Sequence, residues 1–193
     1  EFRGSRVSPV MDVEGKGGLT QPKRPNILVT GTPGTGKTST CEMLAEMTGW
    51  KHLNISQLVK DKSLHSGRNK EWDSFILDED KVCDELEEIM IKGANIVDFH
   101  TCDFFPERWF HLVIVLRTSN EVLYPRLEKR GYSLKKLQEN VEAEIMQVVR
   151  DEAIQSYKKE IVVTLQSDNV NQMESNVNRI CEWIAKAEEK KRK

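Results

Sequence analysis

The sequence lacks the features that mark membrane proteins, disulfide-rich secreted domains and zinc modules. Its longest apolar run is a short one around 112–116, far below the roughly 20 residues of a membrane-spanning helix. The four cysteines are Cys41, Cys83, Cys102 and Cys181, and they form no Cys-x-x-Cys pair. Their spacing therefore predicts neither a zinc site nor a disulfide framework. It favours a protein of a reducing compartment, and the short apolar runs favour one without membrane association.

A large excess of charge of one sign is also missing, because 29 lysines and arginines face 31 aspartates and glutamates. No overall field therefore attracts the chain to nucleic acid. A local basic run, residues 190–193, closes the sequence. It is either a frayed helix end or a nuclear-targeting or RNA-contacting tail.

With 193 residues, the chain is long enough for one domain with a sizeable core. Its first 24 residues show no periodic apolar pattern. We interpret residues 1–10 as vector-derived and Met11 as the native start. Residues 12–24 are rich in Gly and Lys, which predicts disorder. We therefore expect a disordered leader over 1–24 and one folded domain over 25–193.

Residues 25–40, PNILVTGTPGTGKTST, are the most informative stretch. A short apolar run leads into a glycine-rich turn from Gly31 to Gly36, followed by Lys37, Thr38 and residues of helical composition. This is the P-loop pattern, in which glycines let backbone N–H groups converge on phosphate oxygens. Lys37 is expected to reach the β- and γ-phosphates, and the Thr38 hydroxyl to bind Mg²⁺. The flanking strand and helix weaken the alternative of a coincidental glycine turn.

The stretch IVDFH, residues 96–100, is a hydrophobic strand that ends in an acid. Because the carboxyl ends of parallel strands share one edge, Asp98 is expected beside the P-loop, where it can hold Mg²⁺ or its waters. The alternative for Asp98 is a turn residue at a strand end. His100 is either an acid, base or water-orienting residue, or a loop histidine without a chemical role.

Phosphoryl transfer also needs positive charge over the moving group, and a planar guanidinium suits that task. Arg108 and Arg117 are candidates, as are Arg126 and Arg130, which lie one turn apart just before Gly131. The polar segment after Gly131 is a candidate lid. The alternative is that these arginines pair with surface acids. The aromatic residues at positions 104, 105, 109 and 110 are expected in the core rather than stacked on a base.

Strand and helix signals alternate along the rest of the chain. Asp78 is expected to cap a helix that continues to Gly93, whereas 63–74 is polar and aperiodic and is expected to be an exposed excursion. The other expected elements are strands at 51–55, 95–99, 112–116 and 161–165, and helices at 39–47, 56–62 with Ser56 as N-cap, 119–130, 134–160 as one long helix, and from about Gln172 onward. This alternation predicts an α/β fold with a parallel sheet covered on both faces.

Three stretches together resemble a known family. They are GTPGTGKT, IVDFHTCDFFPERWF and VLRTSNEVLYPRLEKRGYSLKKLQENVEAEI. The chain resembles, from about residue 25 to 183, the nuclear adenylate-kinase-like ATPases of the adenylate kinase isoenzyme 6 type, which are linked to small ribosomal subunit maturation. The middle stretch is more specific than the P-loop and separates this family from general adenylate kinases.

The resemblance implies a three-layer P-loop nucleoside-monophosphate kinase fold with a five-stranded parallel sheet, a monophosphate-binding segment around 54–77 and a short lid around 129–139. It implies Mg-ATP-dependent transfer to AMP, with CMP and dAMP as further acceptors, and slow ATP hydrolysis. It makes Asp98 and His100 the acid and histidine of the family, with Arg130 as the lid arginine on ATP. The phosphate-binding residues that it implies are Gly34, Thr35, Gly36, Lys37, Thr38 and Ser39.

One departure concerns the acceptor. Monophosphate kinases commonly open that segment with an Asp followed three residues later by Arg, and here Gln57 and Lys60 stand there. With Arg108 they are the expected substrate-binding residues, and a lysine is a weaker phosphate ligand than a forked guanidinium. A GTPase is excluded, because Asn69-Lys70 should have an Asp two residues after the lysine, and that position holds Trp72.

The resemblance also implies a ribosomal protein of the small subunit and pre-ribosomal particles as partners, rRNA processing as the context, and the nucleus, with the cytoplasm, as location. We favour a monomer. Two alternatives to a monophosphate kinase stay open: a nucleotide-switched assembly factor with secondary kinase activity, and a P-loop kinase of another small metabolite, of the shikimate or gluconate type.

Overall fold

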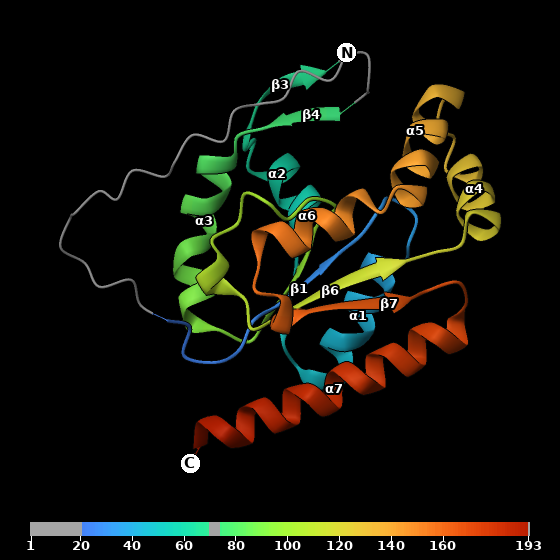
Figure 1. Ribbon diagram of the computed structural model, residues 1–193. Coiled ribbons are helices and arrows are strands. Elements are labelled where there is room, and N and C mark those ends of the chain that lie inside the picture. Colours follow the sequence, from blue (N-terminus) through green and yellow to red (C-terminus); the bar gives the residue numbers. More distant parts are fainter. Residues whose placement is uncertain (1–20, 70–73, 193) are drawn as a thin grey trace.

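The computed structural model describes residues 21–69 and 74–192 (Figure 1). Most of the expected leader, residues 1–20, lies outside the described residues. The last four residues of the expected leader, 21–24, are described. Within them, the Lys23 amide donates to the Ile91 carbonyl at 3.0 Å. Arg24 also pairs with Glu188. Residues 21–24 are therefore attached to the folded domain.

A parallel sheet of five strands forms the centre of the molecule, in the order β2-β5-β1-β6-β7. Its strands are β1 (Ile27–Thr30), β2 (Lys51–Asn54), β5 (Asn95–Asp98), β6 (Leu112–Arg117) and β7 (Val162–Gln166). Every residue of β1 and β5 is buried, as strands covered on both faces require. The chain steps from β1 to either side, which makes the carboxyl end of β1 the expected ligand position.

Helices cover both faces of the sheet, as Figure 1 shows. On one face, Ile27 and Val29 pack with residues of α1 (Lys37–Thr48) and α7 (Val170–Arg192). On the other, Leu28 packs with residues of α2 (Ile55–Asp61), α3 (Glu79–Lys92) and α6 (Val148–Ser156). Alternate strand residues thus serve opposite layers. The predicted three-layer α/β fold is confirmed.

Two local predictions of helix capping have different outcomes. Asp78 caps α3 as expected, because its carboxylate accepts from the Lys81 amide at 3.3 Å. Ser56 does not cap α2; Asn54 does, with its side chain accepting from the Gln57 amide at 2.9 Å. Asn54 is also the last residue of β2, so the strand leads directly into the helix.

The prediction of one long helix over 134–160 is wrong. The chain forms α5 (Leu134–Ile145) and then α6, separated by Gln147, whose φ of 59° breaks the helical path. The apolar period continues through the break, so periodicity alone could not find it. The preceding helix, α4 (Asn120–Lys129), contains Pro125 in its interior.

The segment predicted as an aperiodic excursion, 63–74, is also different. It contributes to an antiparallel hairpin of β3 (His65–Asn69) and β4 (Ser74–Leu77), separate from the main sheet. The His65 and Phe75 rings stack across the pair, with centroids 4.3 Å apart. Such a cross-strand contact is not visible as local periodicity. The hairpin projects beyond the main sheet in Figure 1.

The aromatic-rich segment after β5 packs into the core, as predicted. Phe105, Trp109 and Phe110 are each almost fully buried. Trp109 belongs to a short 3₁₀ turn, η1 (Glu107–Trp109), and a second turn, η2 (Lys159–Ile161), precedes β7. Among the described residues, none of the helices is both long enough and apolar enough to cross a membrane.

Candidate active site

The P-loop follows the carboxyl end of β1 and packs so closely that side chains are excluded at two of its glycines. A Cβ on Gly31 would lie 2.5 Å from the Leu116 carbonyl oxygen, and a Cβ on Gly34 would lie 2.8 Å from the Leu123 side chain. Both glycines have positive φ, 147° and 98°, which other residues rarely adopt. The spacing of glycines therefore reflects both the loop path and its contacts with β6 and α4.

Lys37 begins α1 and folds back over the loop. Its Nζ donates to the carbonyl oxygens of Gly31 and Thr32, at 2.7 and 3.1 Å. Burial lowers the pKa of Lys37 to about 8, against the opposing effect of the Asp98 carboxylate. The ammonium is thus already held at the loop, where phosphate oxygens would be better partners than carbonyls.

Thr38 and Ser39 are exposed in the first turn of α1. Backbone N–H groups at a helix N-terminus have no partner within the helix, and together with the helix dipole they favour phosphate there. The predicted phosphate-binding residues therefore lie together around one exposed helix end.

Asp98 ends β5, the neighbour of β1 in the sheet. Its Oδ2 accepts from Thr38 Oγ1 at 2.7 Å and from Asn54 Nδ2 at 3.1 Å. The predicted pair of Mg²⁺ residues, Thr38 and Asp98, is thus brought into direct contact. Hydroxyl and carboxylate oxygens are the donors that Mg²⁺ prefers, so the residues present fit this ion.

His100 lies two residues beyond Asp98 and its side chain is exposed. Although the residue is exposed overall, desolvation of its ring by the protein around it lowers the pKa of His100 to about 4, and the nearby Lys37 ammonium adds to this effect. The imidazole is therefore neutral at pH 7, and a neutral imidazole can accept a proton or orient a water molecule.

Glu144 is a site residue that the sequence did not reveal. It is 2% exposed, near the end of α5. Its carboxylate accepts from the Thr32 hydroxyl, from Arg117 and, at 3.1 Å, from the Thr118 amide. One buried acid thus joins the P-loop, the end of β6 and the helix that follows the predicted lid. Within an expected long helix, nothing distinguished it from its acidic neighbours.

Arg126 contacts the loop backbone rather than the phosphate position. Its guanidinium donates to the carbonyls of Gly34 and Ser167, each at 3.2 Å, and of Asp168 at 2.7 Å. It therefore joins the P-loop to the segment between β7 and α7. This geometry supports a role for Arg126 in positioning the loop.

Arg130 caps the end of α4 and is exposed. It lies close enough to Lys37 for its charge to lower the pKa of that ammonium. Gly131, with φ of 72°, then turns the chain toward α5. Leu123, Leu127 and Leu137 form a small core between α4 and α5, apart from the two main clusters. Arg130 is thus the predicted arginine that the structure places near the P-loop lysine.

The predicted acceptor residues do not form one site. Gln57 and Lys60 are exposed on α2, and Gln57 Nε2 donates to Asp61 at 2.7 Å. Arg108 lies just before β6, at the amino ends of the strands, whereas the P-loop lies at their carboxyl ends. It donates there to both Glu87 carboxylate oxygens at 2.8 and 2.9 Å. Gln57 and Lys60 are therefore exposed on the same helix, whereas the structure does not bring Arg108 to the P-loop.

The fold and the P-loop geometry are those of the P-loop kinase fold. A family model described as an AAA domain matches residues 27–147. Among solved structures, a shikimate kinase from Bacteroides thetaiotaomicron superposes with a TM-score of 0.59 over 83% of this chain and 98% of its own, at 16% identity. A shikimate kinase from Acinetobacter baumannii gives a TM-score of 0.58 over 84% of this chain and 94% of its own, at 17% identity. At such low identity the likeness shows the fold alone.

Sequence relatives are more specific. An adenylate kinase isoenzyme 6 homolog from Dictyostelium discoideum is 55% identical, over 83% of this chain and 92% of its own length. The homolog from Schizosaccharomyces pombe is 49% identical, over 83% of this chain and 91% of its own length. The chain therefore belongs to the adenylate kinase isoenzyme 6 family, and it is a nucleotide kinase.

Proposed function

We propose that the protein transfers the γ-phosphoryl group of Mg-ATP to a nucleoside monophosphate, with AMP as preferred acceptor and CMP and dAMP as further ones. ATP is hydrolysed slowly when no acceptor is bound. The observation that supports this most directly is the contact between Thr38 Oγ1 and Asp98 Oδ2, 2.7 Å long, beside the P-loop lysine. The names of the relatives favour an adenylate acceptor.

Each protein group has a separate task in this proposal. Backbone N–H groups at the start of α1 bind the ATP phosphates, and Lys37 exchanges its carbonyl partners for phosphate oxygens. Thr38 and Asp98 would hold Mg²⁺ or its waters, and the ion would supply positive charge against the phosphates of ATP. Arg130 stabilises charge on the transferred group when the lid over 129–139 closes.

The remaining groups position the P-loop or contact the acceptor. Arg126 and Glu144 hold the loop in place through backbone carbonyls and the Thr32 hydroxyl. His100, with a lowered pKa, is available as neutral imidazole to orient the acceptor or, during hydrolysis, a water molecule. Lys60 contacts the acceptor phosphate as a single-point donor, so acceptor binding is weaker than with a guanidinium.

The test is a product assay. Protein, Mg-ATP and AMP should yield ADP well above a Lys37→Ala control, and a panel of nucleoside monophosphates, shikimate and gluconate should rank AMP first. Absence of ADP above the Lys37→Ala background would contradict the proposal. Faster phosphorylation of shikimate or gluconate would support a metabolite kinase instead, an alternative that the likeness to the shikimate kinases supports only through the shared fold.

A second function is proposed on a separate observation. A groove of about 620 Å³ lies at the amino ends of the strands, away from the P-loop. Its lining includes the basic residues Arg108, Lys158, Lys186 and Lys190. We infer a role in small ribosomal subunit maturation and rRNA processing, in the nucleus and also the cytoplasm, as a monomer that binds a ribosomal protein and pre-ribosomal particles. ATP-dependent capture of that ribosomal protein is expected. Equal capture with and without ATP would count against a nucleotide switch.

A further inference from the structure

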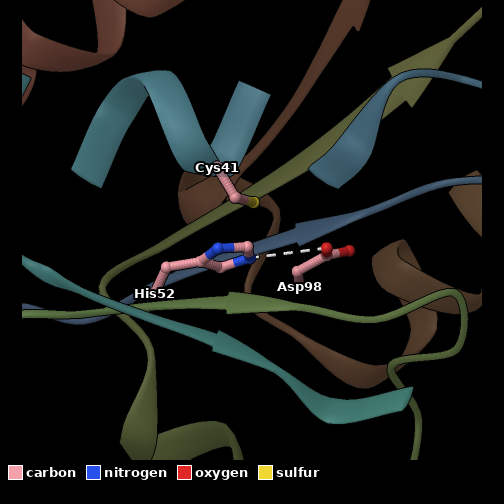
Figure 2. Close-up of side chains that lie close together, drawn as sticks. All are labelled: Cys41, His52 and Asp98. Atoms are coloured by element: carbon pink, nitrogen blue, oxygen red, sulfur yellow. Dashed lines mark ion pairs between the residues drawn. The ribbon is translucent and has the colours of Figure 1, made fainter. Parts of the chain in front are cut away.

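Three side chains with different ligand chemistry converge next to the P-loop (Figure 2). Cys41 belongs to α1, His52 to β2 and Asp98 to the end of β5. Each offers one ligand atom, and these sulfur, nitrogen and oxygen atoms all lie within 4.8 Å of one another. Figure 2 shows His52 pointing toward Asp98, with the Cys41 sulfur above them.

The topology explains why these residues meet. In the pairing of β2 with β5, His52 lies opposite Ile96 and Asn54 lies opposite Asp98. Since side chains alternate along a strand, His52 and Asp98 point to the same face of the sheet. That face is the one covered by α1, as the packing of Ile96 with Cys41 in one core cluster shows. Cys41 follows Lys37 by about one helical turn and therefore faces the sheet.

We propose that Cys41, His52 and Asp98 form a binding site for a divalent transition metal ion, with Zn²⁺ as the ion of best fit. A thiolate, an imidazole and a carboxylate are the ligands of zinc sites, which take three or four such donors. Mg²⁺ prefers oxygen donors only. The proposal goes beyond the proposed phosphoryl transfer and does not need it.

Burial supports a ligand role for all three groups. Cys41 and Asp98 are 0% and 4% exposed. His52 Nε2 is shielded from solvent and has no hydrogen-bond partner, although it lies 3.5 Å from Asp98 Oδ2. Buried polar atoms normally have partners. A metal ion between these groups would supply the missing partner of His52 Nε2.

The distances are compatible with coordination after a small adjustment. Zinc–ligand bonds of about 2.0–2.3 Å place neighbouring donor atoms about 3.3–3.8 Å apart. The present upper separation of 4.8 Å therefore requires the side chains to move inward by about 1 Å. On binding, the Cys41 thiol loses its proton to solvent and the metal ion takes its place.

The site shares Asp98 with the proposed Mg²⁺ position, and this predicts a functional consequence. An ion held by Cys41 and His52 draws the Asp98 carboxylate away from Thr38, which now donates to it. Zn²⁺ should therefore inhibit phosphoryl transfer, and added Mg²⁺ should relieve the inhibition only partly. This consequence alone rests on the proposed function.

Metal binding is tested first, without any reaction. Co²⁺ is titrated into the nucleotide-free full chain in Mg²⁺-free buffer, and thiolate-to-cobalt charge-transfer absorption is followed. We expect saturation at about one ion per chain and loss of the signal when Zn²⁺ displaces Co²⁺. Absence of charge-transfer absorption in the wild-type protein would overturn the proposal.

Variants assign the ligands. Cys41→Ser, a near-isosteric change, should abolish the charge-transfer band, and His52→Gln should weaken Co²⁺ and Zn²⁺ binding by more than about tenfold, since even outer-shell groups contribute that much. Cys83→Ser is the matched control and should bind as the wild type does. Thermal melting verifies that each variant is folded. A band that survives Cys41→Ser, or that Cys83→Ser abolishes, would contradict the assignment.

Inhibition is tested separately. If the protein makes ADP, Zn²⁺ at saturation should slow the wild-type enzyme and leave Cys41→Ser active, with equal rates for both proteins in Zn²⁺-free buffer that contains Mg²⁺. Equal inhibition of both proteins would exclude the idea that Zn²⁺ inhibits by binding at Cys41 and drawing Asp98 away from Thr38. Failure of ADP formation would contradict the proposed function but not the cobalt result, so the two failures are distinguishable.

Discussion

Two regions of the molecule differ in how firmly their residues are held. We call the P-loop region, which is proposed to bind the phosphoryl donor ATP, the donor side, and the region of α2, β3 and β4, which is proposed to bind the phosphoryl acceptor, the acceptor side. On the donor side, Lys37, Arg126 and Glu144 all bond to the P-loop, and the loop glycines pack against β6 and α4. On the proposed acceptor side, Gln57 and Lys60 are exposed on α2, and β3 and β4 form a two-stranded sheet separate from the main one.

This difference bears on whether each substrate site is formed before its substrate binds. A preformed loop binds ATP phosphates without reorganisation, which is the arrangement that favours stabilisation of developing charge. An exposed acceptor segment must close when the acceptor binds, and it can then exclude water from the transferred group. For the proposed function, this contrast predicts that the ATP site is present before binding, whereas the acceptor site is assembled on binding.

The largest effect is expected on the donor side from Asp98→Asn. The variant keeps an oxygen that can accept from Thr38 and removes the negative charge that, in the proposed function, holds Mg²⁺. The turnover number should fall by about 100-fold or more, whereas the dissociation constant for ATP should change by less than about threefold. Single-turnover kinetics and ATP titration measure both. Asp84→Asn, an exposed change on α3, is the control, and equal losses of turnover and ATP binding would indicate a folding role for Asp98.

The buried acid Glu144 gives the next test. Glu144→Gln leaves Arg117 without a charged partner in a mostly buried position and should lower the free energy of unfolding by about 3 kcal/mol. ATP affinity should fall with it, because the Thr32 contact of the P-loop is altered. Urea denaturation measures the first effect. The exposed neighbour change Glu142→Gln should cost less than about 0.5 kcal/mol, and equal costs would refute the role assigned to Glu144.

The pH dependence of ATP binding follows from Lys37. Burial lowers the pKa of Lys37 to about 8 in the nucleotide-free protein, and bound phosphate favours its charged form. Below pH 8 the ammonium is already charged, so affinity is fully present. Above pH 8 binding must take up a proton, and affinity should fall by up to about tenfold per pH unit. Calorimetric titrations between pH 7 and 9 test this. A Lys37→Met variant should lack the slope, and the same slope in both proteins would assign it elsewhere.

A smaller effect is expected on the acceptor side from Lys60→Arg. A guanidinium offers a forked contact to phosphate, so the KM for AMP should fall by about threefold while the KM for ATP stays constant. Steady-state kinetics with each substrate varied in turn measure the two values. Lys62→Arg, which keeps the pairing with Glu85, is the control. A change in the KM for ATP, or none for AMP, would remove Lys60 from the acceptor site.

Much of this comparison could be predicted where the signal is local. The P-loop and the strand ending in Asp98 are continuous stretches with a known spacing, and the structure places both at the same edge of the sheet. The cap at Asp78 and the buried aromatic segment also follow from local chemistry. The break at Gln147 could not be found, because apolar periodicity continues through it.

Contacts made by residues distant in the sequence could not be predicted from one chain. Glu144 reaches Thr32 across 112 positions, and only the register of β2 with β5 brings His52 to Asp98. Cysteine spacing could not indicate the cluster of Cys41, His52 and Asp98 for the same reason, since Cys41 meets these neighbours through the fold rather than through a second cysteine. Arg126 was expected near the phosphate, and its bonds to three carbonyls became evident only from the loop geometry.

Amide hydrogen exchange tests the contrast between the two sides most directly. The full chain is compared alone, with a non-hydrolysable ATP analogue, and with the analogue plus AMP. Residues 31–48 should be protected already in the free protein, whereas 55–69 and 74–77 should gain protection of about tenfold or more only when AMP is added. Fast exchange of the P-loop in the free protein, or an acceptor segment protected before AMP binds, would contradict a preformed donor site and an acceptor site assembled on binding.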